Sequence, residues 1–442
     1  MLLSESQLNH PVVQPIRGVL QRSTTIFLAI ALHAVLLVVA YSVLYAFGVI
    51  QQLPTDQRLL TWDANLFHNL SQTGYDQATS GINAFFPLLP LVWHYTNMSA
   101  ISVSILNACC TWVGVGLLAW SFQLSFRQIL VALSAPMLFF GLVPYAEAFF
   151  FFFSTIMLVG LHQRKHGLVL VGLFLACLSR SAATLFVPAY LFAELLWWSR
   201  SAKLASLLRI ITGLLAILTA VGGVMLAQYK SHGDAFAFFK VHDKLWGHKI
   251  RLPDVVLFSS GGFNILWLDA FALIISFICF ISCAVLGIRW LKKSNPAEGA
   301  FPSKAVLFSM GYCVGAAFFI IFYQGGDLVG MARYVLASPF FVVLLWWCWT
   351  MPAPQQRKLL GIVVGTGLAV IVCMGGVWRF TSFYPGQAVV YFTLFLLYVV
   401  VYLAVSPNAA RWYREAATGL YIVNVLLMVY LFVLFMQGIW IN

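Results

Sequence analysis

The chain has 442 residues, of which 62% are hydrophobic and only 9% are charged. Soluble globular proteins carry about 25% charged residues, so the composition excludes a sizeable soluble domain and predicts a polytopic membrane protein. The formal net charge of +12 would suggest nucleic-acid binding in a soluble protein. Here the basic residues alternate between loops, and nucleic acid is not an expected partner.

The first long apolar run, residues 26–50, follows Arg17 and Arg22. It is too long for the apolar core of a cleaved signal peptide, so it predicts a retained first span with a cytoplasmic N-terminus. The length rule then predicts about 13 spans, within a range of about 11–13. The further predicted spans are residues 101–122, 129–142, 148–161, 168–178, 183–198, 210–227, 263–286, 305–322, 334–351, 359–377, 388–405 and 420–436.

The charges are distributed unequally between the two predicted faces. With a cytoplasmic N-terminus, 16 of the 25 basic residues fall in cytoplasmic segments, as the positive-inside rule requires. Most acids fall on the other face, and the candidate chemistry is therefore expected there. The predicted outer acids are Asp56, Asp63, Asp76, Glu147, Asp234, Asp243, Asp254 and Asp327.

The first outer loop contains "TWDANLFHNLSQTGY", residues 61–75, which predicts a short amphipathic helix with Thr61 as N-cap and Gly74 as its stop. At 100° per residue, Asp63 falls on the apolar arc beside Trp62. An acid aimed at lipid is costly unless it is paired or used. A purely structural interpretation also exists, in which Asp63 complements the dipole of the first turn.

Three further outer features follow in chain order. Pro87 and Pro90 in "GINAFFPLLPL" predict a break where the chain re-enters the membrane. Glu147 in "VPYAEAFFF" lies between apolar runs, and Arg180 in "LSRSAATLF" ends a predicted span. Since an unpaired arginine at that depth is costly, Glu147 or a bound phosphate is the expected partner of Arg180.

The later outer segments add more polar groups. The loop of residues 233–249 has a helical pattern that combines aromatic residues with Asp234, Lys240 and His242, and it is equally consistent with a solvated surface helix. Arg333 and Tyr334 in "GMARYVLASPFF" enter the next span, where Arg333 could be a simple interfacial anchor.

Arginines near lone carboxylates on one membrane face suit an anionic, lipid-anchored substrate, because guanidinium binds phosphate through two hydrogen bonds. No cofactor is expected. The histidines are scattered, the eight cysteines form no CxxC pair, and no nucleotide motif such as GxGxxG occurs, so neither a metal nor a nucleotide is indicated.

Taken together, six segments resemble the PIG-V family in order and approximate spacing. They are "TWDANLFHNLSQTGY", "NAFFPLLPL", "PYAEAFFFFFS", "SRSAAT", "GDAFAFFKVHDKLWG" and "ARYVLASPFF". That family contains the enzyme that adds the second mannose of the GPI anchor, with many bacterial relatives. The sequence departs from the usual pattern at Ser181 and Ala182, and in the "FHNL" that follows Asp63.

The resemblance implies a GT-C glycosyltransferase that takes a hexose, with mannose favoured, from a polyprenyl-phosphate carrier to a lipid, glycan or protein acceptor. It implies one integral membrane domain over residues 1–442, with a GT-C-like core at 24–343 and added spans at 344–442, in a bacterial inner membrane with its site on the outer face. Asp63 would be the base, Glu147 and Arg180 would shape the site, and Arg333 would face the donor phosphate. The other candidate substrate-binding residues are Trp62, Asp234, Lys240, His242 and Tyr334.

The residue types are compatible with this chemistry. A carboxylate such as Asp63 can deprotonate an attacking hydroxyl, and arginines can balance the charge of a departing phosphate. One base and direct displacement predict inversion at the sugar carbon. The alternatives are a transporter or flippase for lipid-linked sugars, and another lipid-modifying enzyme such as an acyltransferase, for which His68 is the modest candidate.

Overall fold

The structure is a computed structural model of the chain. It describes residues 16–75, 81–181, 185–198, 202–247, 249–252, 266–292, 301–325, 328–375 and 411–441, with the single positions 393, 396, 398 and 400. The predicted span at 388–405 lies almost entirely outside these residues, and so do Asp76, Ala182, His248, Asp254 and Asp327.

Every regular element within the described residues is a helix. The helices are α1 (Ile16–Ala46), α2 (Asp56–Leu59), α3 (Asp63–Thr73), the 3₁₀ helix η2 (Gly81–Ala84), α4 (Leu88–Thr96), α5 (Ala100–Ser121), α6 (Phe126–Leu133), the 3₁₀ helix η3 (Pro136–Leu142), α7 (Glu147–His162), α8 (His166–Ser179), α9 (Phe186–Leu196), α10 (Lys203–His232), α11 (Ala237–Trp246), α12 (Leu266–Lys292), α13 (Lys304–Tyr323), α14 (Met331–Val335), α15 (Pro339–Thr350), α16 (Ala353–Gly375) and α18 (Arg411–Met436).

The predicted class of all-α polytopic membrane protein is confirmed. Six described helices are long and apolar enough to cross a membrane, namely α1, α5, α10, α12, α13 and α18, and the bent pair η3 and α7 makes a seventh if it counts as one span. Three shorter apolar helices, α8, α9 and α15, accompany them. The expected total of 11–13 spans, the choice of membrane and the orientation remain predictions.

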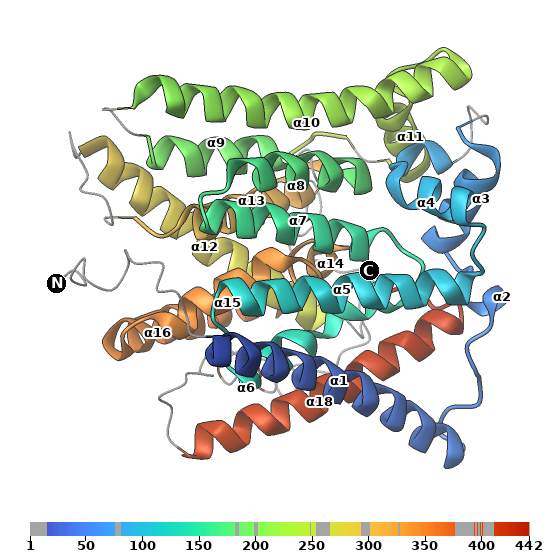
Figure 1. The fold of residues 1–442 in the computed structure, drawn as a ribbon, viewed down its shortest axis with the longest axis horizontal. Helices are drawn as coiled ribbons and strands as arrows, with labels where there is room; N and C mark the ends of the chain where they lie inside the picture. The colour runs from blue at the N-terminus through green and yellow to red at the C-terminus, as the bar shows by residue number, and fades with distance from the viewer. Residues whose placement is uncertain are drawn as a thin grey trace.

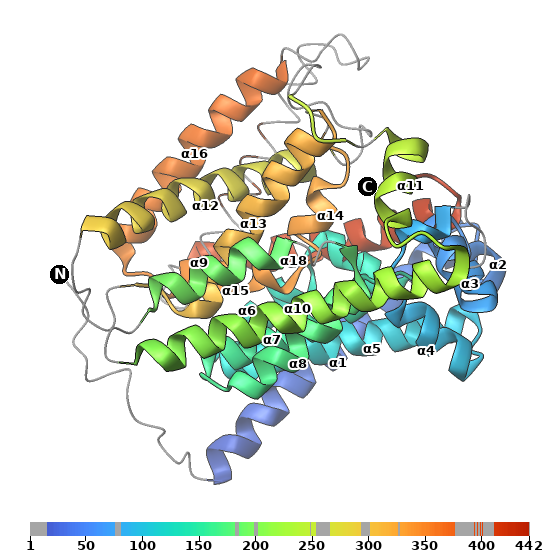
Figure 2. The same cartoon turned by 90° about the horizontal axis from the view of Figure 1, so that it is seen from above.

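The long helices form a bundle, and the short helices gather at one end of it. Figures 1 and 2 show α2, α3 and α11 together at the end away from the start of α1. In the middle, α7 packs on α5 and α8, while α13 packs between α9 and α12. The contact between α7 and α8 depends on a glycine, because a Cβ at Gly172 would lie 2.5 Å from the Met157 backbone nitrogen.

Two predicted spans are interrupted, and both breaks precede a proline. Residues 129–142 divide between α6 and η3, and residues 334–351 divide between α14 and α15. Ala135 and Ser338, the residues directly before the two prolines, have ψ angles of 121° and 154°, outside the helical range. The ring of Pro136 or Pro339 disfavours helical backbone at the residue before it, so the continuous span predicted at 334–351 was wrong at that point.

Candidate functional site

The start of α3 places Asp63 between two distant parts of the chain. Trp62 precedes it with a φ of 50°, in the left-handed region that a bulky residue rarely adopts. The Trp62 Nε1 donates to the Gly438 carbonyl at 3.1 Å, and the Asp63 backbone N–H donates to the Tyr145 hydroxyl at 3.2 Å. Thr61 is not the N-cap that the sequence predicted, since its hydroxyl donates to the Phe435 carbonyl. Gly74 ends the helix as predicted.

Arg333 on α14 joins the two acids that the sequence analysis selected. One guanidinium nitrogen lies 2.8 Å from Asp63 Oδ2, and Nε donates to Glu147 Oε1. The guanidinium carbon also lies 4.8 Å from the Phe140 ring centre and 4.9 Å from that of Tyr145. Arg333 is therefore oriented by two carboxylates and two aromatic faces.

Arg180, which follows the last residue of α8, completes the group. Its guanidinium lies 3.1 Å from Glu147 Oε1, as the sequence predicted for this pair, and 5.2 Å from the Tyr334 ring centre. Asp63, Glu147, Arg180 and Arg333 thus form one connected cluster, which we call the Asp63 network. Its four members come from four separate segments of the chain.

The Asp63 network contains two carboxylates and two guanidinium groups, so its formal charges balance. Burial opposes the charge on Arg333, but Glu147 and Asp63 more than offset that effect and raise the pKa of its guanidinium. Arg333 is consequently a permanent cation. A buried charge is tolerated when it is paired in this way.

The network leaves two carboxylate oxygens open. Glu147 is only 2% exposed, both of its arginine contacts use Oε1, and its buried Oε2 has no hydrogen-bond partner among the described residues. Asp63 is 25% exposed, and its contact with Arg333 uses Oδ2. Buried carboxylate oxygens normally accept hydrogen bonds, so these open acceptors suit a ligand that brings hydroxyl groups.

Two residues that the sequence analysis did not select support the network. The Asn107 amide on α5 donates to the carbonyls of Val143 and Tyr145, at 2.6 and 2.8 Å, and so fixes the turn before α7. That turn bends the chain by 108° between η3 and α7. Asp269 on α12 is fully buried and accepts the Ala332 N–H at 2.9 Å, beside Arg333. Both are polar residues inside predicted spans. The carboxylate of Asp269 within an apolar run was the sequence signal that could have identified it.

The remaining candidates lie apart from these contacts. Asp234 and Lys240 pair with each other at 2.6 Å on the surface, and this hydrogen bond from Lys240 lowers the pKa of Asp234. The His242 ring packs 4.6 Å from that of Phe238. All three are carried by α11 or the turn before it, and α11 packs mainly on η2. The predicted helix in residues 233–249 is confirmed as α11.

Among the residues that the structure describes, no group of three or more His, Cys, Asp or Glu side chains is placed to hold a metal ion.

No family model, no curated protein and no solved structure matches the chain in the comparisons.

Proposed function

We propose that the protein is a GT-C-type glycosyltransferase that moves a hexose from a polyprenyl-phosphate carrier to an acceptor hydroxyl at the outer face of the membrane. The observation that carries the proposal is the Asp63 network, in which a partly exposed carboxylate lies 2.8 Å from a part-buried guanidinium. A base for the acceptor and a cation for the departing phosphate then lie in one site, where direct displacement would have them act on opposite faces of the sugar.

In the proposed reaction, Asp63 Oδ1 takes the proton of the acceptor hydroxyl as its oxygen attacks the anomeric carbon. The new carbon–oxygen bond forms while the bond from that carbon to the phosphate oxygen breaks. The electron pair leaves with the polyprenyl phosphate, which becomes a monoester dianion, and the proton later passes from Asp63 to water. Attack from the side opposite to the phosphate inverts the configuration of the sugar.

In this scheme Arg333 can pair with either of two anions, the Asp63 carboxylate or the donor phosphate. In the structure it holds Asp63 Oδ2, so that one oxygen of the carboxylate is already engaged. Donor phosphate arriving at the guanidinium would compete with Asp63 and release it to bind the acceptor. Glu147 keeps its contacts with Arg180 and Arg333 throughout, so both cations stay aimed at the phosphate.

The sugar itself needs apolar faces and hydrogen-bond acceptors. The Trp62 ring is 47% exposed directly before Asp63, and one of its faces can pack against a hexose. The open Oε2 of Glu147 can accept a sugar hydroxyl. Asp234, Lys240 and His242 lie on α11 or the turn before it and are proposed to meet the acceptor, because they take no part in the Asp63 network.

The proposal is tested by transfer of radiolabelled mannose from polyprenyl-phosphate mannose in membranes that contain the Asp63→Asn variant. Loss of the base is expected to lower the rate by about 10²- to 10⁴-fold, with the variant still monodisperse in detergent. Asp56→Asn is the matched control, since Asp56 lies in the same loop but bonds the Ile101 N–H, and we expect it to transfer normally. Near-normal transfer by Asp63→Asn would reject the base assignment. Movement of intact lipid-linked sugar across proteoliposomes, without transfer, would favour a flippase instead.

A further inference from the structure

A cavity of about 470 Å³ lies between the start of α1 and the turn that joins α5 to α6. It is separate from the Asp63 network, because the two sites contact different parts of α5. Asn107 of α5 bonds the turn before α7, whereas Ala119 of α5 accepts the hydrogen bond from Arg22 in the cavity. About twelve residues of helix separate these two positions, or about 18 Å. The cavity has the size of a small-molecule site.

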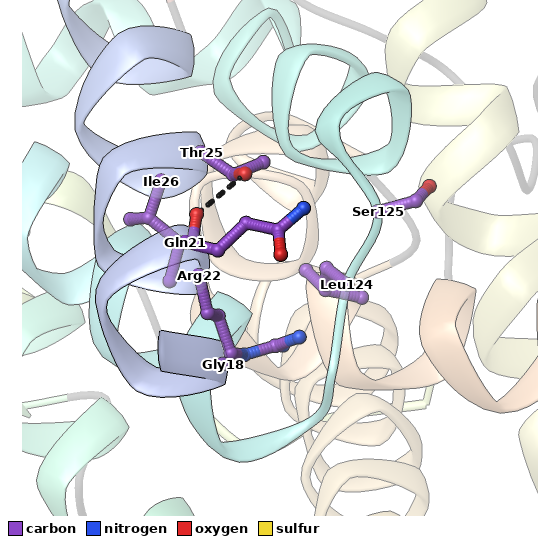
Figure 3. A pocket seen from close by; sticks show the side chains of 7 residues that line it. All are labelled: Gly18, Gln21, Arg22, Thr25, Ile26, Leu124 and Ser125. Carbon is purple, nitrogen blue, oxygen red and sulfur yellow. Dashed lines mark hydrogen bonds between the residues drawn. The ribbon is translucent and has the colours of Figure 1, made fainter. Parts of the chain in front are cut away.

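The cavity wall combines polar and apolar side chains. Figure 3 shows Gln21 and Arg22 extending from α1 toward the turn that carries Leu124 and Ser125. Thr25 lies one turn along α1, where its hydroxyl donates to the Gln21 carbonyl at 2.9 Å. Ile26 adds an apolar surface. A ligand here would meet charge at one end and hydrocarbon at the other.

Arg22 is the charged group of the cavity, and its hydrogen bonding is incomplete. One terminal nitrogen donates to the Ala119 carbonyl at 2.5 Å, and the guanidinium lies 5.9 Å from the Trp120 ring centre. Its Nε is enclosed and has no acceptor among the described residues, and no carboxylate there forms an ion pair with it. A part-buried guanidinium without a counter-ion favours an anionic ligand with oxygen acceptors.

The position of α1 favours a lipid over a water-soluble anion as the ligand of the cavity. Only 22% of the most apolar 18-residue stretch of α1 is buried inside the protein. This is the smallest share among the six long apolar helices of the described chain. Its side chains Leu20 and Phe27 are exposed, so the helix borders the hydrocarbon of the membrane. A ligand that reaches the cavity from this side has acyl chains.

We propose that this cavity binds the phosphodiester head group of a membrane phospholipid, with Arg22 contacting the phosphate and Gln21 and Ser125 contacting the polar head. The acyl chains lie along the outer surface of α1. If the N-terminus is cytoplasmic, as the basic residues predict, the lipid belongs to the cytoplasmic leaflet, opposite to the proposed transferase site. This inference is independent of the proposed function.

The test uses the full chain, purified in detergent, delipidated, and titrated with phosphatidylglycerol under native mass spectrometry. We expect one tightly bound phosphatidylglycerol per chain, no comparable binding of diacylglycerol, and weak binding of inorganic phosphate. Arg22→Gln is expected to weaken phosphatidylglycerol binding by about 10- to 100-fold. Arg127→Gln is the matched control, because Arg127 is an exposed arginine at the same end that does not line the cavity, and we expect it to bind normally.

A second variant keeps the charge and fills the space. Gly18 lines the cavity and a Cβ there would meet no atom within 4 Å, so Gly18→Leu is compatible with the helix and occludes the site. The folded variant should no longer bind phosphatidylglycerol. It therefore tests the proposal even if Arg22→Gln does not fold. Normal lipid binding by folded Gly18→Leu would overturn the proposal. Inorganic phosphate that binds as tightly as phosphatidylglycerol would show that the ligand is a free anion and not a lipid.

Discussion

Glu147 and Glu194 are both buried, and each contacts two cationic side chains, but they differ in how many oxygens those contacts use. At Glu194 on α9, Lys304 lies 2.7 Å from both carboxylate oxygens, and Arg209 lies 3.4 Å from Oε2. At Glu147 both arginines converge on Oε1, and Oε2 is left without a partner among the described residues. The first carboxylate is saturated by its protein contacts, while the second retains an open acceptor.

The difference separates an ion cluster that joins helices from one that can receive a ligand. Lys304 begins α13 and Arg209 lies on α10, so the Glu194 cluster ties three helices together. The Asp63 network also joins distant segments, but it leaves oxygens open on both acids. A network in which every polar atom has a hydrogen-bond partner rigidifies a protein. A network with an unpartnered acceptor can gain a hydrogen bond when a ligand binds.

The largest effect is expected when Arg333 is removed. Arg333→Gln leaves the charges of Asp63 and Glu147 in the interior with one cation fewer, which should lower the free energy of unfolding by about 3–5 kcal/mol. Reversible unfolding in mixed detergent micelles measures this change.

A double variant separates lost charge balance from lost packing. Arg333→Gln with Asp63→Asn removes one charge of each sign and keeps the pair of Arg180 and Glu147. We expect it to be more stable than Arg333→Gln alone. Simple addition of the two single effects would show that Asp63 and Arg333 are not coupled.

A smaller effect is expected at the saturated cluster. In Glu194→Gln the two cations lose their carboxylate, but Lys304 and Arg209 are 14% and 32% exposed and retain some contact with water. The free energy of unfolding should fall by about 1–3 kcal/mol, and the proposed sugar transfer, measured per folded molecule, should be unchanged. Loss of transfer by a folded Glu194→Gln protein would remove the distinction between the two clusters.

The smallest effect is expected at the exposed pair of Asp234 and Lys240. Lys240→Gln should shift the unfolding midpoint by less than about 1 °C, because surface ion pairs contribute little. Lys240 lowers the pKa of Asp234, so any contribution is present at neutral pH and is lost as the pH falls through that lowered pKa. Melting curves at neutral and acidic pH, for the wild type and Lys240→Gln, test this. A large shift at neutral pH would contradict the surface assignment.

The sequence predicted those features that depend on local pattern or on a strong physical cost. Apolar runs predicted the helical membrane class, and the cost of an unpaired arginine predicted Glu147 or a phosphate as the partner of Arg180, of which the structure shows Glu147. The α11 helix followed from residue spacing alone. In each case the structure or contact is determined by residues close in sequence, or by one large cost such as that of an unpaired buried charge.

The other features depend on contacts between distant segments, which periodicity does not contain. Arg333 meets Asp63 across 270 positions of the chain, and no local pattern predicts that one guanidinium would hold both acids. Asn107 and Asp269 stabilise a turn and a short helix that the sequence analysis did not foresee. The prolines at 136 and 339 were the local signals of the two interrupted spans.

The hydrogen bonds from Thr61 and Trp62 to the carbonyls of Phe435 and Gly438 have a practical consequence. They hold residues 435–438, at the end of α18, against the two residues that precede Asp63. An insertion or deletion between positions 436 and 438 would therefore displace the backbone of Trp62 and, with it, the start of α3.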